Sequence, residues 1–159
     1  MTYLLVKWLH IVGSTLLFGT GLGIAFFAWF GYRKGMELGD IGLIRGVLRL
    51  TVLADMVFTA TAAAVQPVTG YVLWRMTGGQ WPDRWMAWVL ALYVFVGACW
   101  LPVVWLQVQL RNAAAQAATV GQLDARFHRR FLLWFALGWP AFLGVMGLFA
   151  LMLTRGYFR

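Results

Sequence analysis

Four long apolar stretches constrain this chain more than any other feature of its sequence. They run from about Tyr3 to Tyr32, from Leu50 to Trp74, from Trp85 to Leu110 and from Phe131 to Thr154. The hydrocarbon layer of a bilayer is about 30 Å thick, and a helix needs roughly 20 mostly apolar residues to cross it. Each stretch reaches that length, so the sequence predicts four membrane-spanning helices.

The composition excludes the common water-soluble classes of protein. Of the 159 residues, 62% are hydrophobic and 11% are charged, whereas ordinary soluble domains are about half apolar and about a quarter charged. A globule of this size has too much surface to hide so many apolar side chains. A soluble enzyme and a nucleic-acid-binding domain are therefore excluded. The expected partner is the lipid bilayer, with the net charge of +8 serving orientation and contact with anionic lipid.

The positions of lysine and arginine predict which way the chain faces. Eight lie in the connections after the first and third spans: Arg33, Lys34, Arg45, Arg49, Arg111, Arg126, Arg129 and Arg130. Five lie at the termini and in the middle connection: Lys7, Arg75, Arg84, Arg155 and Arg159. Basic residues favour the cytoplasmic side, so both termini are predicted outside. Because the connections are short, neighbouring helices should be antiparallel. The predicted fold is all-α, a four-helix transmembrane up-down bundle in one domain over residues 1–159.

Two ionisable side chains, His10 and Asp55, stand out inside the predicted spans. Such groups are costly in a bilayer and often mark functional sites. Spacings of three and four place Asp55 on a polar face of the second span, formed by Thr51, Asp55, Thr59, Ala62, Gln66 and Thr69. This face predicts either a polar relay through Asp55, Thr59 and Gln66 or interhelical hydrogen bonds that fix the packing.

His10 is a candidate ligand for haem iron. At 1.5 Å of rise per residue, Gln66, Tyr93 and Met146 fall within about one helical turn of its depth. Imidazole paired with a thioether or a second nitrogen is a familiar axial set for haem, so a haem b site at His10 with Met146, Gln66 and Tyr93 beside it is one hypothesis. The alternative is a structural histidine bonded to Gln66 or Tyr93, with Met146 filling a gap. His128 lies at the opposite interface and cannot reach the same iron.

Small residues and a proline add two further expectations. Gly19 and Gly23 form a GxxxG pair in the first span, which allows close helix packing, a homodimer contact or room for a flat cofactor. Pro67 has no amide hydrogen, so it frees the carbonyl of Ala63, four residues earlier. That carbonyl then either accepts a hydrogen bond from elsewhere or accompanies a kink.

Three motifs together resemble a known family. They are Lys7-Trp8-Leu9-His10 followed by Phe18-Gly19-Thr20-Gly21-Leu22-Gly23, then Trp100-Leu101-Pro102-Val103-Val104 with Gln107, and Gly138-Trp139-Pro140-Ala141-Phe142 with Leu151-Met152. The pattern resembles the DUF2269 family of bacterial integral membrane proteins. The resemblance implies a four-helix protein of the bacterial inner membrane, so that both termini would be periplasmic.

The element Lys-x-x-His also resembles the start of the HemJ-type protoporphyrinogen oxidases and the CopD-type copper-resistance membrane proteins. By the HemJ resemblance, His10 would be a haem ligand. The HemJ group also uses a lysine in a later span, and this sequence has lysine only at Lys7 and Lys34.

Three functions follow as hypotheses, with no catalytic residue assigned. The leading one is a small inner-membrane protein that binds haem b or a porphyrin and has a redox role. The second is a cofactor-free accessory subunit of a larger membrane complex. The third is a small proton-coupled transporter or channel-like module that uses the polar face of the second span.

Overall fold

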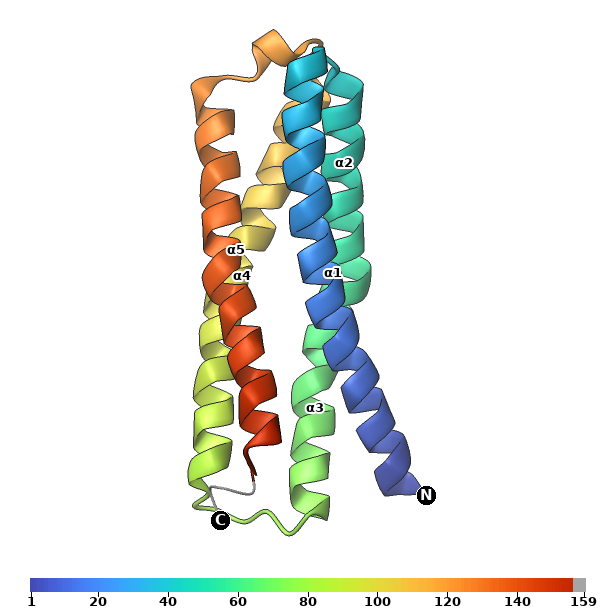
Figure 1. Ribbon diagram of the computed structural model, residues 1–159, viewed down its shortest axis with the longest axis vertical. Coiled ribbons are helices and arrows are strands. Elements are labelled where there is room, and N and C mark those ends of the chain that lie inside the picture. The colour runs from blue at the N-terminus through green and yellow to red at the C-terminus, as the bar shows by residue number, and fades with distance from the viewer. Residues whose placement is uncertain (156–159) are drawn as a thin grey trace.

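A computed structural model describes residues 1–155, and every element in this range is helical (Figure 1). In chain order the elements are α1 (Thr2–Leu38), α2 (Ile41–Ala54), the π-helix η1 (Asp55–Ala60), α3 (Thr61–Met76), α4 (Arg84–Gln116), the short 3₁₀-helix η2 (Val120–Gln122) and α5 (Ala125–Leu153). The prediction of an all-α chain is confirmed. Arg159, which the charge count includes, lies outside the described residues.

Three of the predicted spans correspond to single α-helices. Within the described residues, α1, α4 and α5 are long and apolar enough to cross a membrane. The second predicted span, Leu50 to Trp74, instead falls on α2, η1 and α3, which follow one another without a break. No one of these three segments has the length of a spanning helix, because the wider turns of η1 interrupt the α-helical pattern at Asp55.

The helices extend further than hydrophobicity alone predicts at the first connection. α1 continues past Tyr32 to Leu38 and ends at Gly39, whose φ of 68° is left-handed and favours glycine. α2 begins at Ile41, well before the predicted Leu50, and the Asp40 carboxylate caps it by accepting from the Leu43 amide. One tight turn therefore replaces a longer connection.

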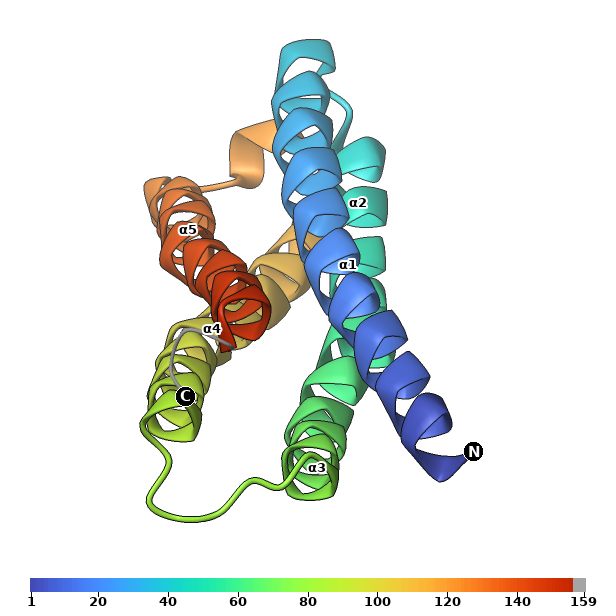
Figure 2. The same ribbon diagram turned by 60° about the horizontal axis from the view of Figure 1, so that its bottom comes forward.

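The helices pack as two groups. Figure 1 shows α1 and α4 running in one direction and α2–η1–α3 and α5 in the other, so that the N-terminus and the end of α5 lie at the same end of the molecule. Figure 2 shows α4 with α5 on one side and α1 with α2 and α3 on the other, and these are also the most extensive contacts. Because α1 and α5 contact each other much less, a closed four-helix up-down bundle stays a prediction.

The two groups are joined most firmly at the end remote from the termini. A cluster of buried side chains at that end is contributed by α1, α2, α4 and α5. It includes Ala28, Ile44, Leu48, Leu110 and Phe131. Arg45 of α2 adds polar contacts by donating to the carbonyls of Ala114 and Ala117 at the end of α4. At the other end, a smaller cluster contains Trp74, Trp85 and Met86. The candidate site lies between these two clusters.

Candidate functional site

A cavity of about 620 Å³ lies between the two groups of helices. Ten aromatic side chains line it: Phe18, Phe26, Trp29, Phe30, Tyr93, Trp100, Trp134, Phe135, Trp139 and Phe142. Small residues also line the cavity and leave room between these rings, among them Gly21, Ala63, Gly97 and Gly138. The volume falls in the range of small-molecule binding sites, which are mostly apolar with a few placed polar groups.

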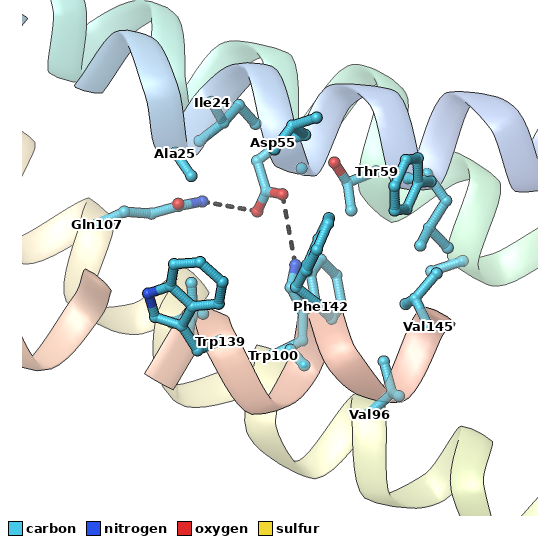
Figure 3. A pocket seen from close by; sticks show the side chains of 18 of the residues that line it. Ile24, Ala25, Asp55, Thr59, Val96, Trp100, Gln107, Trp139, Phe142 and Val145 are labelled. Carbon is cyan, nitrogen blue, oxygen red and sulfur yellow. Dashed lines mark hydrogen bonds between the residues drawn. The ribbon is translucent and has the colours of Figure 1, made fainter. Parts of the chain in front are cut away.

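Asp55 is the acidic residue of this cavity, and neutral donors hold its carboxyl group. Its side chain is 4% exposed and lies near the middle of the continuous helical stretch Ile41–Met76, at the first residue of η1. One carboxyl oxygen accepts from Nε2 of Gln107 at 2.6 Å, and the other accepts from Nε1 of Trp100 at 3.3 Å (Figure 3). π-helical turns are rare and often occur at functional sites.

The contact with Gln107 continues into the next helix. Oε1 of Gln107 accepts from Nε1 of Trp134 at 3.2 Å, so the amide donates to α2–η1–α3 and accepts from α5. The amide orientation is fixed by this pattern, because the indole can only donate. A hydrogen-bonded chain thus runs from Trp134 of α5 through Gln107 of α4 to Asp55 of η1.

Thr59, one turn from Asp55 on η1, also lines the cavity. Its Oγ1 is buried beside the Asp55 carboxyl, with which it interacts, but it makes no hydrogen bond of ordinary geometry among the described residues. A buried hydroxyl without a well-formed hydrogen bond costs free energy unless a ligand or water satisfies it. Figure 3 shows Thr59 and Asp55 at the same wall of the cavity, so a polar group of a bound molecule could reach both.

The cavity opens sideways, between the helices. Several of its lining residues are strongly exposed in the isolated chain: Phe26 is 55% exposed, Leu101 62% and Trp139 54%. These residues lie in the interiors of α1, α4 and α5 rather than at the helix ends. A membrane would cover that side with lipid, so a hydrophobic molecule could enter from the bilayer.

The backbone carbonyl of Ala63, which has no helical donor because of Pro67, accepts a hydrogen bond from Tyr93. The Tyr93 hydroxyl, on α4, donates to the carbonyl oxygen of Ala63 on α3. The hydroxyl therefore satisfies the backbone where the helix lacks its own donor. Of the four residues predicted around a cofactor, Tyr93 is the one that lines the cavity.

His10 and Gln66 belong to a second polar cluster, between α1 and α3. Nδ1 of the half-buried His10 lies 2.8 Å from Oγ1 of Thr69. Nε2 of Gln66 donates to the His10 carbonyl at 3.0 Å, and Ser14 donates to both the His10 carbonyl and Oε1 of Gln66. The structure brings His10 and Gln66 together, as predicted, but Gln66 bonds with the backbone carbonyl of His10. The imidazole ring of His10 has Thr69 as its partner. These bonds join α1 to α3.

The predicted haem donors do not gather in the cavity. His10, Gln66 and Met146 are absent from its lining, and the Met146 side chain, on α5, is 47% exposed. The His10 ring also packs against α3, where a Cβ added at Gly70 would lie 3.2 Å from its Cε1. The donor set therefore does not fit an iron porphyrin in this cavity. A haem b site at His10 stays a prediction.

The predicted relay is likewise divided between two places. Asp55 and Thr59 lie in the cavity, and Gln66 lies in the His10 cluster. No hydrogen bond among the described residues connects Thr59 to Gln66. What these residues share is position on one face of the helical stretch, as their spacing predicts.

Sequence reasoning missed the partners of Asp55. Trp100 and Gln107 were quoted as parts of a family motif, without a role in a site. Two signals could have found them. Gln107 is one of two amides, with Gln109, inside an otherwise apolar span, where an amide requires an internal partner. Its spacing of seven from Trp100 places both residues on one face of α4. What the sequence does not show is the rotation of α4 that turns this face towards Asp55.

The comparison with protein families agrees with the helical architecture. A family model described as a predicted integral membrane protein (DUF2269) matches residues 4–156. The chain belongs to the DUF2269 family. The resemblance inferred from its motifs is thus confirmed, and this DUF2269 protein is an integral membrane protein that contacts the lipid bilayer. No curated protein and no solved structure matches it, and the similarity to the HemJ and CopD groups stays a prediction.

Proposed function

We propose that this DUF2269 protein binds a small amphipathic, ring-bearing molecule within the membrane. The observation that carries the proposal is the cavity of about 620 Å³, whose aromatic walls suit flat apolar groups and whose one carboxyl, Asp55, can anchor a polar group. The buried hydroxyl of Thr59, beside Asp55, supplies a second polar contact.

The proposed mechanism of binding has three parts. The ligand enters from the bilayer through the exposed side of the cavity, past Trp139. Its rings stack against the aromatic walls, which supply large contact areas at fixed positions. Its polar group then bonds with Asp55 and Thr59, while Gln107 and Trp100 keep the carboxyl oriented. Binding and release of a lipophile by such a site would serve transport, sensing or presentation to a partner protein.

A cavity-filling substitution tests this proposal. Gly138 lines the cavity, and a Cβ built there meets nothing within 4 Å, so Gly138→Phe should fill the space without a clash at Cβ. Gly23 also has open space around its Cβ but does not line the cavity, which makes Gly23→Phe a matched control.

The probe is 1-aminoanthracene, a fluorescent ring compound with one polar amine. Energy transfer from tryptophan to this probe, above a blank of detergent alone, reports probe held near the ten tryptophans of the protein. Trp29, Trp100, Trp134 and Trp139 line the cavity, and the comparison with Gly138→Phe isolates the probe held there. We expect saturable transfer for the native protein and Gly23→Phe and its loss in Gly138→Phe. Equal transfer in all three proteins would reject the proposal.

Haem binding at His10 and a proton relay through Asp55 remain as two separate proposals. Haem b at His10, with a redox role, is supported by the bond between Nδ1 and Thr69, since a fixed second nitrogen is the usual way to orient a ligating histidine. A Soret band in the purified protein that disappears in His10→Ala would support it, and a colourless folded protein would remove it. The proton relay predicts a flux that Asp55→Asn abolishes.

Location and partners also belong to the proposal. The DUF2269 resemblance supports a bacterial inner membrane. The larger number of basic residues in the connections after the first and third spans favours periplasmic termini. Gly19 and Gly23 have no neighbour within 4 Å of a built Cβ, so their face is free for a second copy or for another subunit of a complex. Alkaline phosphatase fused after the last residue should be active, and phosphatase fused after Thr119 should be inactive.

A further inference from the structure

Asp55 differs from the other four acidic residues because it neither accepts from an amide that begins a helix nor forms an ion pair. Three of the others cap helices and one forms an ion pair: Asp40, Asp83 and Asp124 accept from the amides that begin α2, α4 and α5, and Glu37 lies 3.0 Å from Lys34. Asp55 begins no such cap, and its partners are the neutral amide of Gln107 and the neutral indole of Trp100. No cation of residues 1–155 lies within ion-pair distance of it.

The rest of the cavity supplies no positive charge either. Among the described residues, its lining contains no lysine, arginine or histidine, and Tyr93 is the other titratable group there. The Tyr93 hydroxyl already donates to Ala63. A carboxylate in a low-dielectric site is costly unless it is paired with an opposite charge. A positively charged ligand would therefore supply the charge that the protein itself does not provide.

The aromatic walls suit an organic cation. Figure 3 shows Trp100, Trp139 and Phe142 around the space beside Asp55. Ring faces attract cations, most strongly the face of tryptophan, and the attraction grows when the cation is desolvated. The cation–π contacts that the chain makes for itself use Tyr3, Trp74 and Trp85, none of which lines the cavity. Among the described residues, no cation of the chain therefore occupies the rings of the cavity, although Phe142 stacks on Phe18 with one of its faces.

The same lining disfavours an inorganic ion. Hard cations such as Ca²⁺ need several oxygen ligands, whereas the oxygens near Asp55 are its own carboxyl, the Thr59 hydroxyl and the amide of Gln107, which is bonded to Trp134. A bulky cation whose charge is shielded by rings or alkyl groups needs no such ligands.

We propose that the cavity selects lipophilic monovalent cations, with the Asp55 carboxylate as counter-charge and the rings of Trp100, Trp139 and Phe142 as the surrounding cage. This inference rests on the proposed function, because it names the class of molecule that the same cavity takes. The ligand class includes phosphonium and quaternary ammonium compounds with aromatic or alkyl substituents.

Two ions of nearly the same shape and opposite charge test the charge preference. Tetraphenylphosphonium and tetraphenylborate are titrated separately into the detergent-solubilised full-length protein, with isothermal titration calorimetry and detergent blanks. We expect the phosphonium to bind about tenfold or more tightly than the borate. Asp55→Asn, which keeps the shape of the side chain, should reduce phosphonium binding by about the same factor and leave the weak binding of the borate unchanged.

The outcomes separate this inference from the proposed function. Equal affinity for the two ions, or phosphonium binding that survives Asp55→Asn, would overturn the charge preference even if 1-aminoanthracene still binds and Gly138→Phe still blocks it. A native protein that does not bind 1-aminoanthracene would instead contradict the proposed function. The comparison of the two ions uses the native protein, so it holds even if the Asp55 variant does not fold.

Discussion

At the scale of single residues, Gln107 determines how the carboxyl of the cavity is held. Its side chain is 1% exposed, and it has a partner on each side: it donates to Asp55 and accepts from Trp134. A buried polar group that loses its partner keeps the full cost of its desolvation. Gln107 therefore contributes to stability through two groups that would otherwise be unpaired, besides orienting Asp55 for a ligand.

Gln107→Leu should lower the free energy of unfolding by about 1–3 kcal/mol, because it leaves the Trp134 indole and one Asp55 oxygen without partners. Thermal unfolding in detergent measures the change. Gln116→Leu is the matched control, since Gln116 is an exposed residue near the end of the same helix. If the two variants were equally stable, the buried chain of hydrogen bonds would not have the role described.

A second prediction concerns Asp83, in the connection between α3 and α4. The Trp74 indole donates to it at 2.7 Å, and this bond holds the pKa of the Asp83 carboxyl below its ordinary value of 3.8. A carboxyl with a lowered folded-state pKa stabilises the fold fully above that ordinary value and loses the contribution as the pH falls through the lower folded value. The charged form also caps α4 at the Met86 amide.

Asp83→Ala should therefore cost about 1 kcal/mol at neutral pH through the lost cap alone, and the indole bond adds to this. The difference from the native protein should shrink as the pH falls below about 4. Unfolding midpoints measured across this range test the sign. Asp124 caps α5 and has no indole partner among the described contacts. Asp124→Ala therefore measures the stability that a helix cap alone contributes. A difference that grows in acid would contradict the assignment.

At the scale of elements, the contact between α1 and α2 depends on close approach. A Cβ added at Gly31 would lie 2.6 Å from Cγ2 of Val47, a distance that forces the helices or the valine to move. The GxxxG pair Gly19 and Gly23, which the sequence offered as a packing face, instead has open space around it. Glycine spacing alone thus identified a surface where helices can approach, without showing which glycines another helix contacts.

Gly31→Ala should destabilise the protein by about 1–3 kcal/mol through overpacking against Val47. Gly23→Ala should be neutral or stabilising by up to about 1 kcal/mol, since alanine is the better helix former. Thermal unfolding of the two variants under the same conditions measures the contrast. If Gly23→Ala were destabilised and Gly31→Ala were unaffected, the packing described for α1 would be contradicted.

At the scale of the whole molecule, hydrophobicity predicted where the chain is helical better than where helices end. Three spans coincide with α1, α4 and α5, because length and apolar content decide them. The first connection was predicted too long, since Gly39 and Asp40 complete a turn that hydropathy does not register. The interruption at η1 also has no signal in the apolar pattern.

The candidate site could be predicted only in part for a similar reason. Asp55 and Thr59 stood out because polar groups are rare inside spans. Their partners Gln107 and Trp100 depend on how α4 is rotated against η1, which one sequence does not specify. His10 and Gln66 were expected at one depth and do lie together, but depth gives no direction, and both residues lie outside the lining of the cavity.

The most direct test of the central claim is to locate a bound lipophile. The full-length protein in detergent is photolabelled with 1-azidopyrene, digested, and analysed by tandem mass spectrometry. We predict that the label concentrates on cavity-facing residues such as Trp100, Trp139 and Phe142, and that Gly138→Phe removes it from them. Label distributed over exposed aromatic residues outside the cavity, such as Trp88 and Trp105, and unchanged by Gly138→Phe, would contradict a ligand site between the two groups of helices.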